Sequence, residues 1–158
     1  MPYHREFCYG ILAANCGQPV ARKDVQLLRV LHVEDDANDA VLFAHACKQA
    51  VVQVNLIRVM DVEQAKEYLL GQGEYADRNK WPLPQVVLLD LKLPHADGFE
   101  LLSWLRGHPD FARLPVLVFT ASVSREDQAR AIAAGANSYY VKPASFEALV
   151  QMVGSLLN

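Results

Sequence analysis

The sequence predicts an α/β domain in which a doubly wound, five-stranded parallel sheet is covered by helices on both faces. Two observations carry this prediction. Five short apolar runs alternate with segments of helical periodicity, and the connections between them are short. Four of these runs, all but the second, are also almost continuously apolar, which is typical of strands that are buried on both faces of a parallel sheet. Right-handed crossovers then distribute the helices over the two faces.

The apolar runs and the helical segments follow one another in strict alternation. The expected strands cover residues 28–33, 53–59, 85–89, 116–119 and 138–141. The expected helices, with their end residues, cover residues 38–50, 61–71, 97–107, 124–135 and 145–158. The last of these helices has an apolar stripe that suits burial against a sheet. That stripe consists of Phe146, Leu149, Val150, Val153 and Leu157.

Capping residues mark several helix ends. Asp61 with Gln64, and Ser124 with Asp127, have the spacing of a capping box, in which a side chain satisfies a free backbone N–H of the first turn. Gly71 is expected to end the helix that Asp61 begins, because glycine readily takes the left-handed conformation of a helix C-terminus.

Residues 1–26 lack helical or strand periodicity, so we expect an N-terminal extension, mobile in solution, before a domain of residues 27–158. His4, Cys8 and Cys16 lie in this extension and could attract a metal ion. No second pair of ligands follows them, and a structural zinc site needs four. We therefore favour a loose tail over a metal site.

Composition excludes several classes of protein. The 158 residues carry a net charge of −3 and no basic run, so we expect no direct contact with nucleic acid. No segment has the make-up of a signal peptide or the ~20 apolar residues of a membrane span, so we expect no membrane contact. Three cysteines without close pairing favour a reducing, cytoplasmic setting.

Polar residues follow four of the five expected strands. Because ligands of doubly wound sheets bind beyond the carboxyl ends of the strands, these residues are expected to meet at one edge. They are Glu34 and Asp35 after the first strand, Asp90 after the third, Thr120 after the fourth, and Lys142 and Pro143 after the fifth.

Three carboxylates at one edge repel one another unless a cation lies among them. Mg²⁺ suits this place, since it is held by one or two carboxylates together with water and phosphate oxygens. Asp36 is either a further ligand or a solvated residue before the helix. Asn38 and Asp39 are expected to cap the helix that follows.

The same residues suit the phosphorylation of a carboxylate. Asp90 would attack a phosphoryl group and form an acyl phosphate. Mg²⁺ held by Asp35 and Asp90, with Thr120 and Lys142, would offset the charge on the phosphoryl oxygens. Lys142 could instead pair with Asp90 for structural reasons alone. The bond before Pro143 can adopt the cis form and fix the turn.

Four segments surround the polar residues at the strand ends. They are Val33-Glu34-Asp35-Asp36; Leu88-Leu89-Asp90-Leu91-Lys92-Leu93-Pro94 with Asp97-Gly98 behind it; Pro115-Val116-Leu117-Val118-Phe119-Thr120-Ala121-Ser122; and Tyr139-Tyr140-Val141-Lys142-Pro143. In this order and spacing, the four segments resemble the receiver domain of two-component response regulators, over residues 27–158. A longer loop at 71–84 and the segment 106–115 are similar to single-domain receivers found beside phytochrome-type histidine kinases.

The resemblance implies a strand order of 2-1-3-4-5 and a role for each matching residue. Asp90 is the phosphoacceptor. Glu34, Asp35, Asp90 and the backbone carbonyl of Lys92 hold Mg²⁺, and the Glu-Asp pair replaces the Asp-Asp pair of other members. The residues that bind the phosphoryl group or respond to it are Thr120, Lys142 and Tyr139.

The resemblance also implies a histidine kinase, of the phytochrome-like kind, as the phosphoryl donor. No output domain follows residue 158, so we expect a stand-alone regulator that signals through the face of its fourth helix, fifth strand and fifth helix to an unknown downstream protein. Met152 and Leu156 widen the apolar surface of the last helix. They either pack in the ordinary way or support a homodimer through this face.

Other functions fit the residues less well. A phosphatase with an aspartate nucleophile usually has a second acid two residues later, where this chain has Lys92. A flavin-binding module of the same topology needs a phosphate-binding loop after the first strand, and none is present. A pseudo-receiver that binds partners without accepting phosphate stays the main alternative.

Overall fold

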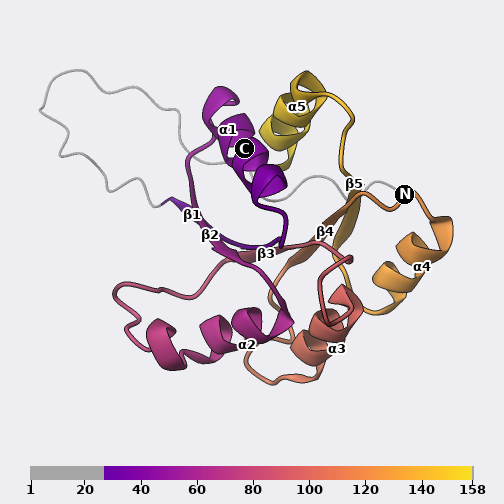
Figure 1. The fold of residues 1–158 in the computed structure, drawn as a ribbon. Helices are drawn as coiled ribbons and strands as arrows, with labels where there is room; N and C mark the ends of the chain where they lie inside the picture. The colour runs from indigo at the N-terminus through magenta and orange to yellow at the C-terminus, as the bar shows by residue number, and fades with distance from the viewer. Residues whose placement is uncertain (1–26, 158) are drawn as a thin grey trace, which may run out of the picture.

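Five parallel strands form the centre of the protein in the computed structural model, which describes residues 27–157 (Figure 1). The spatial order is β2-β1-β3-β4-β5, so the predicted fold class and strand order are confirmed. All the pairings between neighbouring strands are parallel. The strands are β1 (Leu28–Val33), β2 (Val54–Val59), β3 (Val86–Leu89), β4 (Val116–Thr120) and β5 (Ser138–Val141).

Helices cover both faces of this sheet (Figure 1). The helices α1 and α5 lie side by side on one face, while α2, α3 and α4 lie on the other. Each follows its strand after a short loop, as alternation along the chain predicted. The helices are α1 (Ala37–Gln49), α2 (Val62–Leu70), the short 3₁₀ helix η1 (Gly73–Tyr75), α3 (Gly98–Gly107), α4 (Arg125–Ala133) and α5 (Phe146–Leu157).

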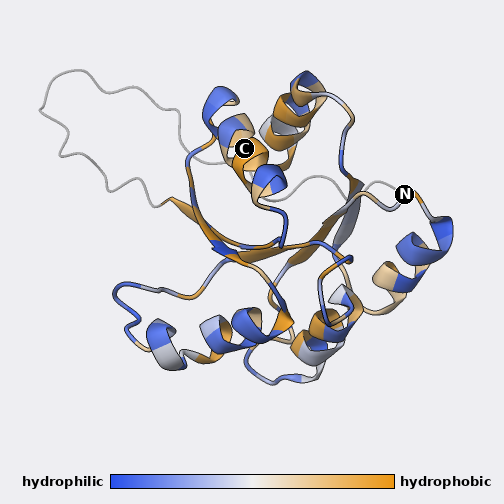
Figure 2. Cartoon of the chain, viewed as in Figure 1, coloured by the Kyte–Doolittle hydropathy of each residue, from blue (hydrophilic) through white to orange (hydrophobic). Residues whose placement is uncertain are grey.

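Two hydrophobic cores hold the layers together, one on each face of the sheet. Successive residues of a strand point to opposite faces, so Val30 packs with α1 and α5 while Leu31 and Val33 pack with α2 and α3. Figure 2 shows the hydrophobic centre of the sheet and the hydrophilic outer sides of the helices. Met152 packs against the core beneath α5, which supports ordinary packing for that residue.

The loop between α2 and β3 is more ordered than its polar sequence suggests. The rings of Tyr68, Tyr75 and Trp81 meet edge to face, with centroids 5.1 to 6.3 Å apart. The guanidinium of Arg78 donates hydrogen bonds to the carbonyl oxygens of Tyr68 and Leu69 in the last turn of α2. The loop therefore caps the C-terminal end of α2 and adds Tyr75 and Trp81 to the hydrophobic core on this face of the sheet.

Two capping predictions hold in part. Asp61 accepts from the backbone N–H of Gln64, but the Gln64 side chain accepts from Met60 instead of Asp61. Ser124 accepts from the backbone N–H of Asp127 at 3.2 Å. Gly71 ends α2 with φ of 66°, as expected.

The expected caps of α1 were wrong. Asp36 caps this helix: its carboxylate accepts hydrogen bonds from the backbone N–H groups of Asn38 and Asp39, at 2.7 and 3.1 Å. Asp36 has an extended backbone, so its side chain can fold back over the first turn, which Asn38 and Asp39 cannot do from inside the helix.

The peptide bond before Pro143 is trans, since residues 27–157 contain no cis peptide bond. The turn after β5 is held instead by the backbone N–H of Lys142, which donates to the carbonyl oxygen of Thr120 at 2.8 Å. Within residues 27–157, no helix has both the length and the apolar character that crossing a bilayer requires. The possible metal ligands His4, Cys8 and Cys16 lie outside the described residues.

Candidate functional site

The ammonium group of Lys142 is the centre of the candidate site. Its Nζ lies 2.6 Å from Glu34 Oε2, 2.7 Å from Asp39 Oδ2 and 2.8 Å from Asp90 Oδ2. These groups come from the carboxyl ends of β1, β3 and β5 and from the first turn of α1. The sheet thus brings together residues that are up to 108 positions apart in the sequence.

Asp90 is buried at the end of β3 with both carboxylate oxygens engaged. Oδ2 accepts from Lys142, and Oδ1 accepts from the backbone N–H of Lys92 at 3.0 Å. Gly98 packs directly behind it: a Cβ atom at that position would lie 2.5 Å from the carbonyl oxygen of Asp90. A larger residue at position 98 would therefore force the backbone of this loop to shift.

Glu34 is almost fully buried, with 1% of its surface exposed. Burial raises the pKa of Glu34, against the opposing effects of Lys142 and of the backbone N–H of Asp36. Arg58 fixes the turn after β1 by donating to the carbonyl oxygens of Glu34 and Asp35, at 2.9 and 2.7 Å. The acidic pair therefore sits on a rigid turn.

Lys142 is positively charged in this environment. Burial acts to lower the pKa of Lys142, but hydrogen bonds to Asp39, Asp90 and Glu34 outweigh burial and hold the pKa above its usual value. The site thus keeps one fixed cation among its acids.

Glu34, Asp35 and Asp90 fit a hard divalent cation. Each offers one carboxylate oxygen, and these oxygens lie within 4.8 Å of one another. Asp35 is exposed while the other two are buried, so an ion could enter from solvent on the side of Asp35. Carboxylates together with water are the ligands that Mg²⁺ and Mn²⁺ take. The role of the Lys92 carbonyl in such a site stays a prediction.

Thr120 and Tyr139 are connected through Ser122 on the loop between β4 and α4. Ser122 donates its backbone N–H to Thr120 Oγ1 at 3.4 Å, and its carbonyl oxygen accepts from the Tyr139 hydroxyl at 3.0 Å. Its own hydroxyl donates to Asp127 on α4 at 2.6 Å. One buried serine therefore contacts a residue of β4, one of β5 and one of α4.

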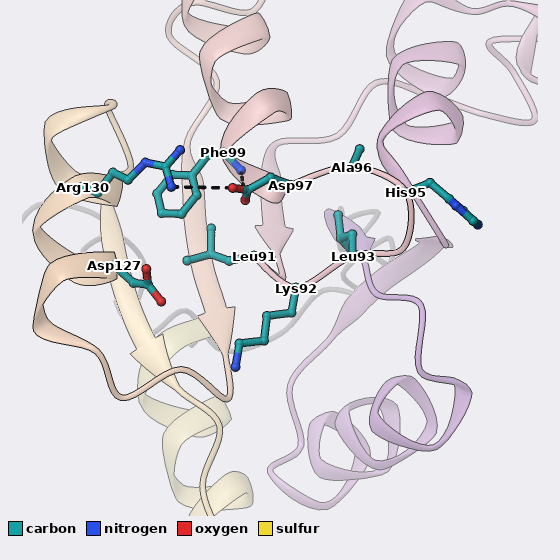
Figure 3. Close-up of a pocket in the computed structure, with 9 residues that line it drawn as sticks. All are labelled: Leu91, Lys92, Leu93, His95, Ala96, Asp97, Phe99, Asp127 and Arg130. Carbon is teal, nitrogen blue, oxygen red and sulfur yellow. Dashed lines mark hydrogen bonds and ion pairs between the residues drawn. The ribbon is translucent and has the colours of Figure 1, made fainter.

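A cavity of about 500 Å³ opens beside the site, between the loop that follows β3 and helix α4 (Figure 3). At its wall, the guanidinium carbon of Arg130 lies 3.8 Å from the centre of the Phe99 ring. Arg130 Nη1 also lies 3.6 Å from Asp97 Oδ2. These contacts join α4 to the start of α3 near Asp90.

Sequence reasoning missed two residues of the site. Asp39 was expected to cap α1, but its carboxylate bonds to Lys142. Its position five residues after Glu34, one helical turn past the acidic pair, was the available signal. His32 is 3% exposed and its Nε2 lies 4.0 Å from Glu34 Oε2. Only its place inside an otherwise apolar strand could have indicated it.

His32 is neutral at ordinary pH. Burial, followed by the positive charges of Lys142 and Arg58, lowers its pKa to about 3. Its ring packs against Phe43 of α1, with centroids 5.0 Å apart. The imidazole thus fills the space beneath Glu34 without adding charge.

The fold and the site define a class of α/β domains that carry an acidic pocket and a lysine at the carboxyl edge of a doubly wound sheet. Comparison with known families is more specific. Residues 30–154 match the model of the response regulator receiver domain. The chain belongs to this family.

Two relatives match this chain over most of their own length. The chain is 35% identical to the response regulator Rcp1 of Synechocystis sp. over 124 residues, which is 78% of this chain and 82% of the relative. It is 38% identical to the probable methanogenesis regulatory protein FilR2 of Methanothrix harundinacea over 125 residues, which is 78% of this chain and 77% of the relative.

Solved structures agree with this assignment. Response regulator RPA3017 of R. palustris superposes with a TM-score of 0.79 at 34% identity, over 82% of this chain and 91% of that one. The phosphorylated cyanobacterial phytochrome response regulator RcpA gives 0.74 at 32% identity, with the same coverage. The Mn²⁺-bound form of Rcp1 gives 0.71 at 34%, over 81% of this chain and 90% of that one.

Family membership establishes the general activity. The protein is a receiver-domain response regulator of two-component signalling, a family whose mechanism is phosphorylation of an aspartate, and is not an enzyme in the ordinary sense. Receiver domains bind Mg²⁺ or Mn²⁺ at an acidic pocket, and the acids found together here fit that property.

Proposed function

We propose that this protein accepts a phosphoryl group on Asp90 from a histidine kinase, with Mg²⁺ as the metal, and signals through the face of α4, β5 and α5. One observation carries the proposal: Lys142 draws Asp90 and Glu34 together at the edge of the sheet where Asp35 completes a set of cation ligands. The Asp90 carboxylate is thereby held beside the Lys142 ammonium and beside the place where a divalent cation would bind.

In the transfer step, a carboxylate oxygen of Asp90 attacks the phosphorus atom of a phosphohistidine. A P–O bond forms as the P–N bond breaks, and the bonding electrons leave with the imidazole nitrogen, which takes a proton from solvent. Mg²⁺ held by Glu34, Asp35, Asp90 and the Lys92 carbonyl would supply positive charge that offsets the charge of the phosphoryl oxygens.

The chain's own groups complete this environment. The Lys92 N–H already donates to Asp90 Oδ1 and keeps the carboxylate oriented. The Lys142 ammonium and the Thr120 hydroxyl are the donors for phosphoryl oxygens, because charge-assisted hydrogen bonds are the strongest that side chains offer. The same arrangement would assist the attack of water on the acyl phosphate, in which the bond between phosphorus and the Asp90 oxygen breaks and inorganic phosphate leaves, so the protein would also catalyse its own dephosphorylation.

The response to phosphorylation would pass through Ser122. Movement of the Thr120 hydroxyl toward a phosphoryl group would break its contact with the Ser122 N–H and disturb the Tyr139 hydrogen bond and α4. Val123 and Val141 are exposed on this side, at 81% and 40%, and offer apolar contacts to a downstream protein or to a second copy of the chain. The Ser122 loop and α4 would then exist in two conformations, and the charge of the phosphoryl group on Asp90 would shift the balance between them.

The relatives suggest the upstream partner. Several similar proteins are named as phytochrome or bacteriophytochrome response regulators, so the donor is proposed to be a phytochrome-like histidine kinase in the cytoplasm. The domain boundary near residue 27 belongs to this proposal too.

The test is phosphorylation by acetyl phosphate, read as intact mass with and without Mg²⁺. The wild-type chain should gain one phosphoryl group only when Mg²⁺ is present. Asp90→Asn should gain none, while Asp110→Asn, which alters an exposed acid outside the site, should behave as wild type.

Two outcomes would contradict the proposal. Phosphorylation that persists in Asp90→Asn would place the acceptor elsewhere. Failure of the wild-type chain with both acetyl phosphate and the phosphoryl analogue beryllofluoride would instead favour a pseudo-receiver, which binds partners without phosphate.

A further inference from the structure

Asp39 is the one partner of Lys142 that neither the sequence reasoning nor the proposed transfer step uses. It lies in the first turn of α1, and its Oδ2 accepts a hydrogen bond from Lys142 Nζ at 2.7 Å. That bond is as short as those to Glu34 and Asp90. Asp39 therefore belongs to the site through geometry alone.

The ammonium group of Lys142 has no donor to spare. A lysine ammonium carries three protons, and three carboxylates each accept one of them. Lys142 can donate to a phosphoryl oxygen only if one of these three bonds is exchanged.

Exposure indicates which bond is exchanged most easily. The Glu34 side chain is 1% exposed, so loss of Lys142 would leave a buried carboxylate without its cation, which is costly. The Asp39 side chain is 41% exposed, so water can replace the ammonium there. The Asp39 bond is the cheapest of the three to give up.

The negative charge of Asp39 also opposes phosphorylation of Asp90. Asp39 and Asp90 bond to one nitrogen, so the two carboxylates lie within two hydrogen-bond lengths of each other. A phosphoryl group on Asp90 brings further negative charge to this place. Like charges at such a distance disfavour the phosphorylated state.

We propose that Asp39 is a positioning residue that restrains Lys142 before phosphorylation and gives the lysine up to the phosphoryl group, so that its carboxylate slows phosphorylation and weakens the phosphorylated state. The inference rests on the proposed function of Asp90. It assigns Asp39 no contact with the phosphoryl group itself.

The test compares Asp39→Asn with wild type in two reactions. The rate of phosphorylation by acetyl phosphate should rise about threefold, and beryllofluoride should half-saturate at a concentration lower by about the same factor, as expected for one partly exposed ionic contact. Fluorine NMR of the bound analogue reports the second quantity and does not depend on a phosphoryl donor.

Asp36→Asn is the matched control. Asp36 is an exposed acid three residues earlier whose carboxylate bonds to the backbone of α1, and asparagine caps helices equally well. This variant removes the same charge nearby but leaves Lys142 untouched, so it should stay close to wild type. Asp39→Glu restores the carboxylate and should return both quantities toward wild-type values.

A direct readout of Lys142 separates positioning from a purely structural role. In nitrogen-15 spectra, the ammonium protons of Lys142 should exchange with water faster in Asp39→Asn than in wild type or Asp36→Asn. Unfolding curves of all variants check that each is folded.

Three results would overturn the inference. They are an unchanged or slower reaction in Asp39→Asn, an equal effect in Asp36→Asn, and unaltered exchange at Lys142. If the wild-type chain takes up neither phosphoryl group nor beryllofluoride, the proposed function fails and this inference fails with it. If the wild-type chain is phosphorylated and Asp39→Asn behaves just as wild type does, only the inference about Asp39 is overturned and the proposed function stands.

Discussion

Among single residues, His32 shows how burial sets an ionisation state beside a functional site. It lies in β1 beneath Glu34, 3% exposed, and its pKa is lowered from its usual value of 6.5 to about 3, chiefly by burial. In the unfolded chain the same imidazole titrates near its ordinary value. The folded state therefore binds fewer protons than the unfolded state between these two values, and stability rises with pH across that window.

The free energy of unfolding should fall by about 2 kcal/mol between pH 7 and pH 5 on account of His32, because protonation stabilises only the unfolded chain there. His32→Gln removes the titrating group and should flatten this part of the pH profile. Urea unfolding at several pH values measures both. A wild-type profile as flat as that of the variant would show that His32 can be protonated in the folded protein.

Asp39 and Asp36 illustrate the limit of sequence reasoning at this scale. The sequence offered Asp36 as a metal ligand or a solvated residue and Asp39 as a helix cap. Both are aspartates at the start of the same helix, so residue type could not tell them apart. The extended backbone of Asp36 assigns it to the cap, and the turn of α1 carries Asp39 to Lys142. One helical turn separates the carboxylate that caps α1 from the carboxylate that bonds to Lys142.

Among elements, the loop from β3 to α3 is the most constrained. Gly98 begins α3 directly against the backbone of Asp90 and Leu91, and a Cβ atom there would lie 2.5 and 2.7 Å from their atoms. Asp97 caps the same helix by accepting from the backbone N–H of Phe99. Asp90 is thus positioned by the start of the next helix as well as by its own strand.

Gly98→Ala should lower stability by about 1 to 3 kcal/mol and slow phosphorylation of Asp90, because backbone atoms must move to admit the methyl group. Gly107→Ala is the control, since it adds the same methyl group to the last turn of α3 where nothing lies within 4 Å. That variant should be neutral or slightly more stable. Thermal unfolding and the acetyl phosphate reaction measure the two effects; equal behaviour of the variants would contradict the close approach.

At the scale of the whole molecule, two cores on opposite faces of one sheet account for the layered architecture. Residues from β1, β3 and β4 contribute to both cores through alternate side chains. A sheet shared in this way makes the layers depend on each other, so unfolding is expected to be cooperative.

A fragment of residues 27–158 should unfold at the same urea concentration as the full chain and be phosphorylated at the same rate, because among the described residues the buried side chains of both cores and the groups of the site all lie within residues 30–153. Chemical unfolding of the two chains side by side is the measurement. A lower midpoint for the fragment would show that residues 1–26 stabilise the domain, and would move the predicted domain boundary.

The sequence by itself determined the fold class, the strand boundaries to within one or two residues, and the meeting of Glu34, Asp90 and Lys142 at one edge. Apolar periodicity and polar strand ends are local signals, and parallel strands must align their carboxyl ends, so these features follow from the chain alone.

Only the tertiary structure decided how the ammonium protons of Lys142 are shared, which acid caps α1, and that a buried neutral histidine supports Glu34. These features depend on side-chain directions and on distances between elements that are far apart in sequence. No local pattern encodes such distances, because they are set by how the helices pack against the sheet.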